Sequence, residues 1–127
     1  MRLLSLLPVL ALCACDPNHA STQTLHGENL RLDFTLRADD DPTVGFNHFG
    51  LVVRDKKGGV PIDPPVVSAS SASAPGTEVP VNVQPLGDGR FALLDVMFAT
   101  SGMWTLSVRS STTDGSNDSA RFDIAVQ

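Results

Sequence analysis

The chain has 127 residues, of which 42% are hydrophobic and 18% charged, and its formal net charge is −5. This length and composition fit one small globular domain and exclude two separate hydrophobic cores. The net negative charge argues against nucleic acid as a partner, because binding to phosphates requires a basic surface.

The N-terminus has the pattern of an export signal. Arg2 is followed by an apolar run from Leu3 to Leu12, which is too short to span a bilayer as a helix. Both cysteines, Cys13 and Cys15, lie directly after this run. A domain that has lost residues 1–14 therefore contains no pair of thiols for a disulfide.

The sequence Leu12-Cys13-Ala14-Cys15 resembles a bacterial lipobox, in which a small residue precedes a cysteine that is acylated before cleavage. The resemblance implies that residues 1–14 are a lipoprotein signal peptide and that Cys15 is lipidated. Several acyl chains anchor stably, since each buried methylene contributes about 0.8 kcal/mol. We therefore expect a lipoprotein of the cell envelope that is anchored in a membrane and faces the periplasm. An ordinary secretory signal with cleavage nearby is the alternative.

Residues 15–28 are predicted to be a flexible tether, and residues 29–127 the folded domain. The tether is polar, contains Pro17, His19 and His26, and shows no apolar period. From residue 29 onwards apolar and polar residues alternate, which predicts a half-buried strand. Its expected inward side chains are Leu30, Leu32, Phe34 and Leu36.

Three consecutive acids, Asp39 to Asp41, and Pro42 predict a loop after this strand. The acids lack the spaced oxygen ligands of a calcium cage, so a solvated turn is favoured over a calcium site. The next strand is expected at 45–55, with Phe49, Leu51 and Val53 on one face and His48 on the other.

The middle of the chain is poorer in signals. Residues 60–67 contain three prolines and predict a kinked edge segment, while "SASSASAPG" at 68–76 predicts a long connection. Alternation returns at 79–83 and then in 90–98, where a bulge between Phe91 and Leu94 would put both side chains on one face. Two further strands are predicted, with the inward residues Trp104, Leu106, Val108, Phe122, Ile124 and Val126.

Six or seven such strands, with turn signals between them and no helical period, predict an all-β fold. The expected architecture is an immunoglobulin-like antiparallel β-sandwich. We predict a single core between its two sheets, formed by Phe34, Phe49, Leu51, Val96, Phe98, Trp104, Leu106, Phe122 and Ile124.

Strand parity sends Met97 and Met103 to the face opposite the core. Because the turn at 99–102 joins their strands, we expect the two thioethers to be neighbours across a hairpin. With His48 they would form a copper site, since thioethers suit cuprous ion, provided that the strand of His48 shares their sheet. Alternatively, the methionines are adaptable apolar cover or a contact surface for a partner.

The spans 44–55 and 87–108 resemble the YtkA-like and FixH-like domain family. The matching positions are Asn47, Phe49, Asp55, Gly89, Arg90, Phe91, Gly102, Trp104, Leu106 and Val108. The resemblance implies an immunoglobulin-like fold, export or membrane attachment and, for some members, copper handling or assembly of a haem-copper oxidase. Where such domains carry a loop rich in Met and His, this chain has "SASSASAPGTEVP", and Thr100 stands where a methionine is often found.

We therefore expect a lipid-anchored accessory or interaction domain without catalytic activity or cofactor. Its partners would be the membrane, through the lipid, and a protein of the cell envelope. The alternative is a copper-binding, chaperone-like domain. Serine hydrolysis would need a histidine held by a carboxylate beside a serine. Two of the three histidines fall in the expected tether, which disfavours an enzyme.

Overall fold

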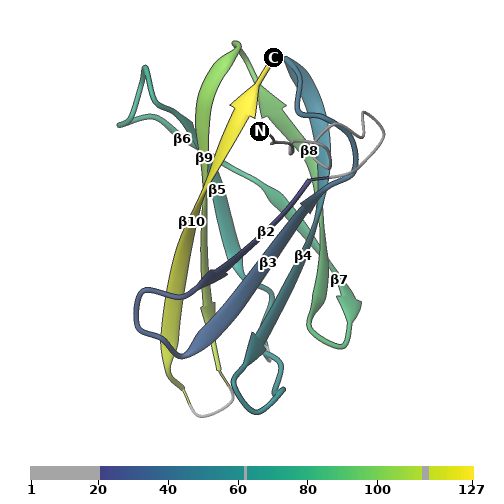
Figure 1. Ribbon diagram of the computed structural model, residues 1–127, viewed down its shortest axis with the longest axis vertical. Coiled ribbons are helices and arrows are strands. Elements are labelled where there is room, and N and C mark those ends of the chain that lie inside the picture. The colour runs from purple at the N-terminus through teal and green to yellow at the C-terminus, as the bar shows by residue number, and fades with distance from the viewer. Residues whose placement is uncertain (1–20, 62, 113–114) are drawn as a thin grey trace, which may run out of the picture.

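The computed structural model describes residues 21–61, 63–112 and 115–127, which form two antiparallel sheets packed face to face (Figure 1). Along the first sheet lie β2 (Thr22–His26), β3 (Leu32–Ala38), β4 (Gly45–Asp55), β8 (Arg90–Phe98) and β7 (Asn82–Gly87). Along the second lie β10 (Asn117–Val126), β9 (Gly102–Ser111), β5 (Val66–Ser71) and β6 (Glu78–Pro80). The predicted all-β sandwich is confirmed.

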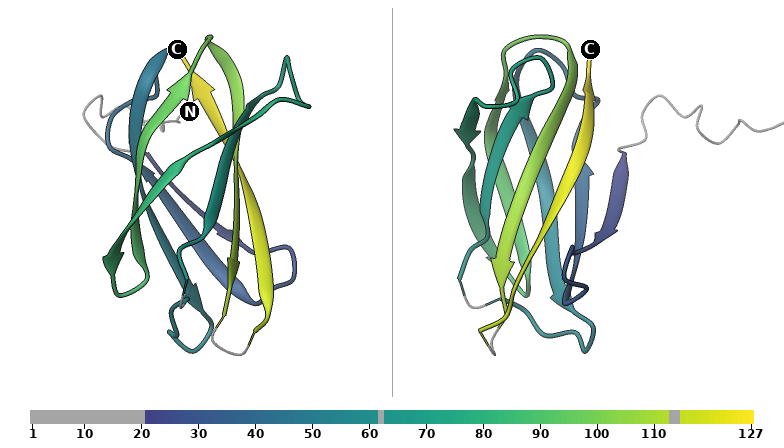
Figure 2. Two further views of the ribbon diagram at one scale, coloured as in Figure 1. Left: turned by 180° about the vertical axis from the view of Figure 1, so that it is seen from behind. Right: turned by 90° about the vertical axis from the view of Figure 1, so that its left-hand side faces the viewer.

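The strand order is that of an immunoglobulin-like fold with one addition. From β3 onwards, the neighbours β3-β4-β8-β7 take the places of immunoglobulin strands A, B, E and D, and β6-β5-β9-β10 take those of C′, C, F and G. The continuous segment of β6 and β7 crosses from one sheet to the other (Figure 2). β2 is an extra edge strand beside β3, so the described residues hold nine strands rather than six or seven.

The prediction of a tether over 15–28 is wrong for Thr22–His26, because these residues form β2 and pair with β3. Every second side chain of β2 is only half-buried and the others are exposed, which leaves no strong apolar period. The imidazole Nδ1 of His26 lies 2.6 Å from the carboxylate of Asp33 on β3. This contact adds to the backbone pairing of the two strands.

The long connection expected at 68–76 is also only partly present. Ser68 to Ser71 belong to β5, which lies between β9 and β6 inside the second sheet. The turn that follows is short, with the amide of Ala74 donating to Ser71 O and that of Thr77 to Ala74 O. Small side chains weaken the sequence signal of a strand, but they do not prevent its backbone from pairing on both sides.

All nine residues predicted for the core are buried. Phe49, Phe98 and Trp104 form an aromatic chain through it, with ring centroids 6.2 Å and 5.2 Å apart. Trp104 is 6% exposed, and its indole N–H donates to Thr100 O at 2.9 Å. The tryptophan is therefore a core residue whose one polar group is paired.

Asp118 is the one charged side chain among the buried residues that the structure describes. It occupies an inward position of β10, in phase with Phe122 and Ile124. Its two carboxylate oxygens accept four backbone N–H groups, from Asn29, Arg31, Leu32 and Ser119, at 2.7 to 2.9 Å. We call this arrangement the Asp118 clamp. It joins the β2–β3 turn of one sheet to the first residues of β10 in the other.

The clamp explains why Leu30 does not continue the inward alternation predicted for it. The chain turns there with φ of 58°, and the Leu30 side chain is 60% exposed. Burial by itself would raise the pKa of Asp118, but the four N–H donors favour the charged form and together lower the pKa below its ordinary value of 3.8.

Replacing Trp104 with Ala should lower the free energy of unfolding by about 3 to 5 kcal/mol, because a large aromatic side chain leaves a cavity. Urea unfolding of the variant and its parent measures this difference. Met103→Ala, one residue away on the exposed face, is the matched control and should unfold close to the parent. Equal midpoints for Trp104→Ala and the parent would contradict the placement of the indole in the core.

Because of the Asp118 clamp, the free energy of unfolding should depend on pH. Since the pKa is lower in the folded state, the stabilisation is present above the unfolded value of 3.8 and is lost as the pH falls through the folded value. Asp118→Asn turns an NH₂ group towards backbone N–H donors, which should cost about 1 to 3 kcal/mol at neutral pH.

The test is urea unfolding of the parent and of Asp118→Asn at pH 7 and at pH 3. We expect the difference in unfolding free energy between the two proteins to be smaller at pH 3 than at pH 7. If the difference in unfolding free energy is the same at both pH values, the charge of Asp118 does not contribute to stability.

Candidate functional site

The outer face of the first sheet carries an exposed apolar pair at one end of β4 and β8. Phe46 on β4 stands directly opposite Met97 on β8 in the antiparallel register. Phe46 is 65% exposed and Met97 is 40% exposed. Directly opposed side chains of adjacent strands lie close enough to form one surface.

A β-bulge beside this pair sets which side chains share its face. Asn47 pairs with Val96 and Phe49 with Leu93, so that the single residue His48 faces two residues of β8, Leu94 and Asp95. Asp95 has φ of 55°. A bulge in β8 is thus confirmed, but it lies after Leu93 rather than between Phe91 and Leu94.

The expectation that the bulge puts Leu94 on the same face as Phe91 is therefore wrong. Leu93 is fully buried, whereas Leu94 is half-buried on the outer face. The bulge brings Val96 and Phe98 back into phase with Phe91 and Leu93, and Met97 consequently faces outwards.

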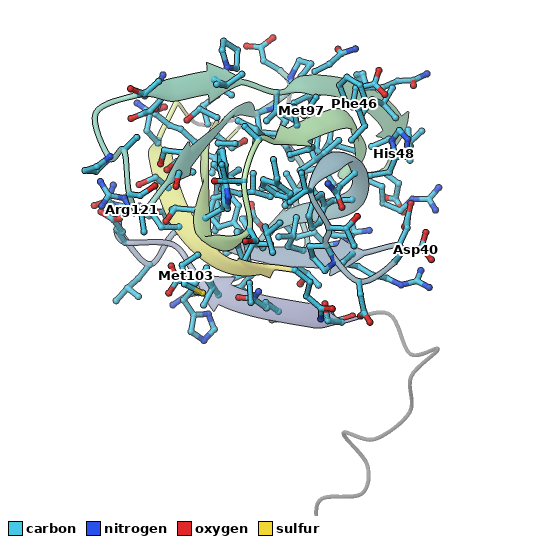
Figure 3. The ribbon with its side chains drawn as sticks, turned by 90° about the horizontal axis from the view of Figure 1, so that it is seen from above. Asp40, Phe46, His48, Met97, Met103 and Arg121 are labelled. Carbon is cyan, nitrogen blue, oxygen red and sulfur yellow. The ribbon has the colours of Figure 1, made fainter. Side chains whose placement is uncertain are left out.

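His48 lies on the same outer face, two residues after Phe46. Its Nδ1 faces the backbone N–H of Asp95 at 3.5 Å, a long contact in which the ring nitrogen is the acceptor. Phe46, His48 and Met97 are grouped on one side of the molecule (Figure 3), and we call them the Phe46 patch.

Exposed carboxylates flank the Phe46 patch. Asp39, Asp40 and Asp41 are all exposed in the loop before β4, and Asp95 is exposed at the bulge. The loop adjoins the patch directly, since the amide of Asp39 donates to His48 O at 3.3 Å. In the described part of the chain, the two ion pairs are His26–Asp33 and Arg54–Asp88, so neither neutralises these acids. We call the four carboxylates the acidic rim.

The loop that bears most of the acidic rim is held at several points. The side chain of Asn47 accepts from Thr43 N at 3.0 Å and donates to Thr43 O and Gly45 O at 2.8 and 2.9 Å. At the C-terminus, Gln127 O accepts from Val44 N, and Gln127 N donates to Pro42 O. The backbone of this loop is therefore tied to the start of β4, which bears Phe46.

Met103 does not belong to this surface, and the expectation that it neighbours Met97 is wrong. It lies on β9 in the second sheet, where it pairs with Ala125 and is 49% exposed. The two methionines point to opposite sides of the sandwich (Figure 3). The turn at 99–102 carries the chain from one sheet to the other, so it does not form a hairpin.

The three residues predicted as copper ligands are consequently separated. His48 and Met97 share one face, and Met103 lies on the other sheet. Within residues 21–61, 63–112 and 115–127, the structure shows no group of three or more His, Cys, Asp or Glu side chains placed to hold a metal ion. Cys15, the predicted lipidation site, lies outside the described residues.

Several positions that carry the family resemblance have structural roles here. Asn47 holds the acidic loop, and Asp55 accepts the amides of Lys57 and Gly59 in the turn after β4. Gly89 has φ of 75°, and a Cβ there would lie 2.7 Å from Val53 O. These roles concern the fold and do not identify an activity.

Comparison with protein-family models finds no match, and comparison with curated proteins finds no significant similarity. The resemblance to the YtkA-like and FixH-like family therefore stays a prediction. In the part of the chain that the structure describes, no helix is long and apolar enough to cross a membrane.

The sequence indicates His48 and Met97 but not the full surface. Phe46 is in outward phase with His48, and the three acids form the exposed loop that the sequence predicts. What brings them together is the pairing of β4 with β8, which is a long-range contact.

Asn47→Ala should release the acidic loop, because it removes the side-chain hydrogen bonds to Thr43 and Gly45. We expect a loss of about 1 kcal/mol in unfolding free energy and faster amide exchange at Thr43 and Val44. Asn82→Ala is the control, since Asn82 is exposed on β7. Unchanged exchange at both amides in Asn47→Ala would contradict the role given to Asn47.

Proposed function

We propose that this protein is a lipid-anchored accessory domain of the bacterial cell envelope that binds another protein and catalyses no reaction. The N-terminal part of the proposal depends on the lipobox-like sequence ending at Cys15. The observation that carries the binding function is the Phe46 patch, where an aromatic ring 65% exposed stands opposite an exposed methionine.

Single exposed apolar residues are common and need no explanation. The Phe46 patch differs because its members come from two strands and meet on a rigid sheet. Phe and Met are enriched in protein interfaces, and a surrounding polar rim is typical of them. The patch and the acidic rim therefore have the anatomy of a small interface.

Because β2 pairs with β3, fewer residues separate the proposed lipid anchor from the folded domain than the sequence predicts. Residues 15–20 are the six residues between the proposed lipid and the described chain. Even fully extended, six residues reach only about 20 to 22 Å. The predicted tether of 15–28 would have allowed about twice that distance. A lipidated Cys15 would keep the domain close to the membrane surface.

Copper binding by His48 and Met97 is a second candidate function. The observation in its favour is that both side chains lie on one face beside the bulge. Imidazole and thioether suit cuprous ion, but the two provide fewer donors than the predicted set because Met103 is on the other sheet. Competition with a cuprous chelator tests this function: Met97→Ala should weaken binding, whereas Met103→Ala should not.

The anchoring is tested by mass spectrometry of the mature protein from the membrane fraction. We expect Cys15 at the N-terminus carrying acyl chains, and residues 1–14 absent. Cys15→Ser should abolish the modification and move the protein out of the membrane fraction, while Cys13→Ser should not. An unmodified Cys15 in a soluble periplasmic product would contradict the proposed anchor.

A further inference from the structure

We infer that the Phe46 patch docks a protein surface that has an apolar centre and Lys or Arg side chains around it. The inference rests on the proposed function as an interaction domain and adds the chemistry of the partner. It is drawn from the combination of exposed apolar side chains with the acidic rim.

The centre of the Phe46 patch is apolar. Phe46 and Met97 are opposed across two strands, and the nearby Val44 is 51% exposed. These three side chains lie at the end of the sandwich where β4 begins and β8 stops. Covering these side chains would remove apolar surface from water, which is the general driving force for association.

The charges around the patch are mainly negative. Asp39, Asp40, Asp41 and Asp95 flank it without a salt bridge among the described residues. Lys and Arg gather instead towards the opposite end of the strands, at Arg31, Arg54, Lys56, Lys57, Arg90 and Arg109. Arg37, on β3, is the cation of the first sheet on the side of the patch. The surroundings of Phe46 are therefore acidic, and a cationic partner surface complements them.

Charge also decides between a protein and the other surfaces that could cover Phe46. Anionic lipid headgroups attract basic segments and repel acidic ones, so a bilayer is a poor match for this rim. A second copy of the chain would bring two acidic rims together, which like charges disfavour. A protein surface with basic side chains meets both the apolar and the electrostatic requirement.

The start of β2 indicates how far from the membrane this partner would lie. Ser21 O accepts the amide of Ala38 at the end of β3, and Ala38 pairs with Phe49 of β4. The start of β2 and the Phe46 patch are thus towards the same end of the sandwich. With a lipidated Cys15 only six residues before Ser21, the partner surface would lie close to the membrane.

The experiment is site-specific photocrosslinking of the full chain in its native membranes. Phe46 is replaced by p-benzoylphenylalanine in one variant and Met103 in a matched control, since Met103 is also exposed but lies on the opposite sheet. Each is made with the native rim and with Asp40→Lys and Asp41→Lys. Tandem mass spectrometry identifies the crosslinked peptide and the state of Cys15.

We expect a protein adduct at position 46, absent at position 103, whose crosslinked peptide contains Lys or Arg beside apolar residues. The two charge reversals should reduce its yield about tenfold, equivalent to roughly 1.4 kcal/mol. Raising the salt from about 0.1 M to 1 M shortens the Debye length from about 10 to 3 Å and should reduce the yield with the native rim. This salt series tests the inference even if the reversed variant fails to fold.

Other outcomes overturn the inference. A phospholipid adduct at position 46 would assign the patch to the membrane, and an adduct with a second copy would assign it to a dimer. Equal protein adducts at 46 and 103, or a yield indifferent to charge and salt, would also refute it. The absence of any adduct from a protein with lipidated Cys15 refutes the docking but leaves the anchor intact. Conversely, a charge-dependent adduct with an unmodified Cys15 refutes only the anchor.

Discussion

The Asp118 clamp connects the two sheets at the point where the extra strand β2 is attached. One carboxylate accepts four backbone N–H groups, two of them from the turn between β2 and β3 and one from the first residue of β3. Buried charges are retained in proteins when they are fully hydrogen-bonded, and this one is paired with main-chain donors that cannot move without unfolding the turn. The clamp therefore fixes the course of the chain just after β2.

Fixing that turn has a consequence for the whole molecule. Because β2 lies along β3, the described chain begins near the end of the sandwich that bears the Phe46 patch, and not at the end that bears the clamp. A strand of 11 residues such as β4 extends about 35 Å, so the two ends of the domain face different surroundings when one of them is anchored. The clamp, the pairing of β2 with β3 and the position of the patch are parts of one arrangement.

The sequence allowed a good prediction of what each strand buries and a poor one of how the strands are connected. The period of two placed Trp104, Phe98 and Phe122 in the core because parity is a local property of a strand. It could not say that the chain changes sheets between Met97 and Met103, since sheet membership depends on distant partners. The burial of Asp118 could have been predicted from the sequence, because Asp118 is in phase with the apolar residues of β10.

If Cys15 carries the proposed lipid, the Phe46 end of the domain lies nearer the membrane than the Lys57 end, which points away from it. The mature lipoprotein would contain no free thiol, so single cysteines at Thr43 and at Lys57 can each carry a fluorescent donor for energy transfer to acceptor lipids in vesicles. We expect clearly stronger transfer from position 43 than from position 57. Equal transfer from the two positions, or stronger transfer from position 57, would contradict it.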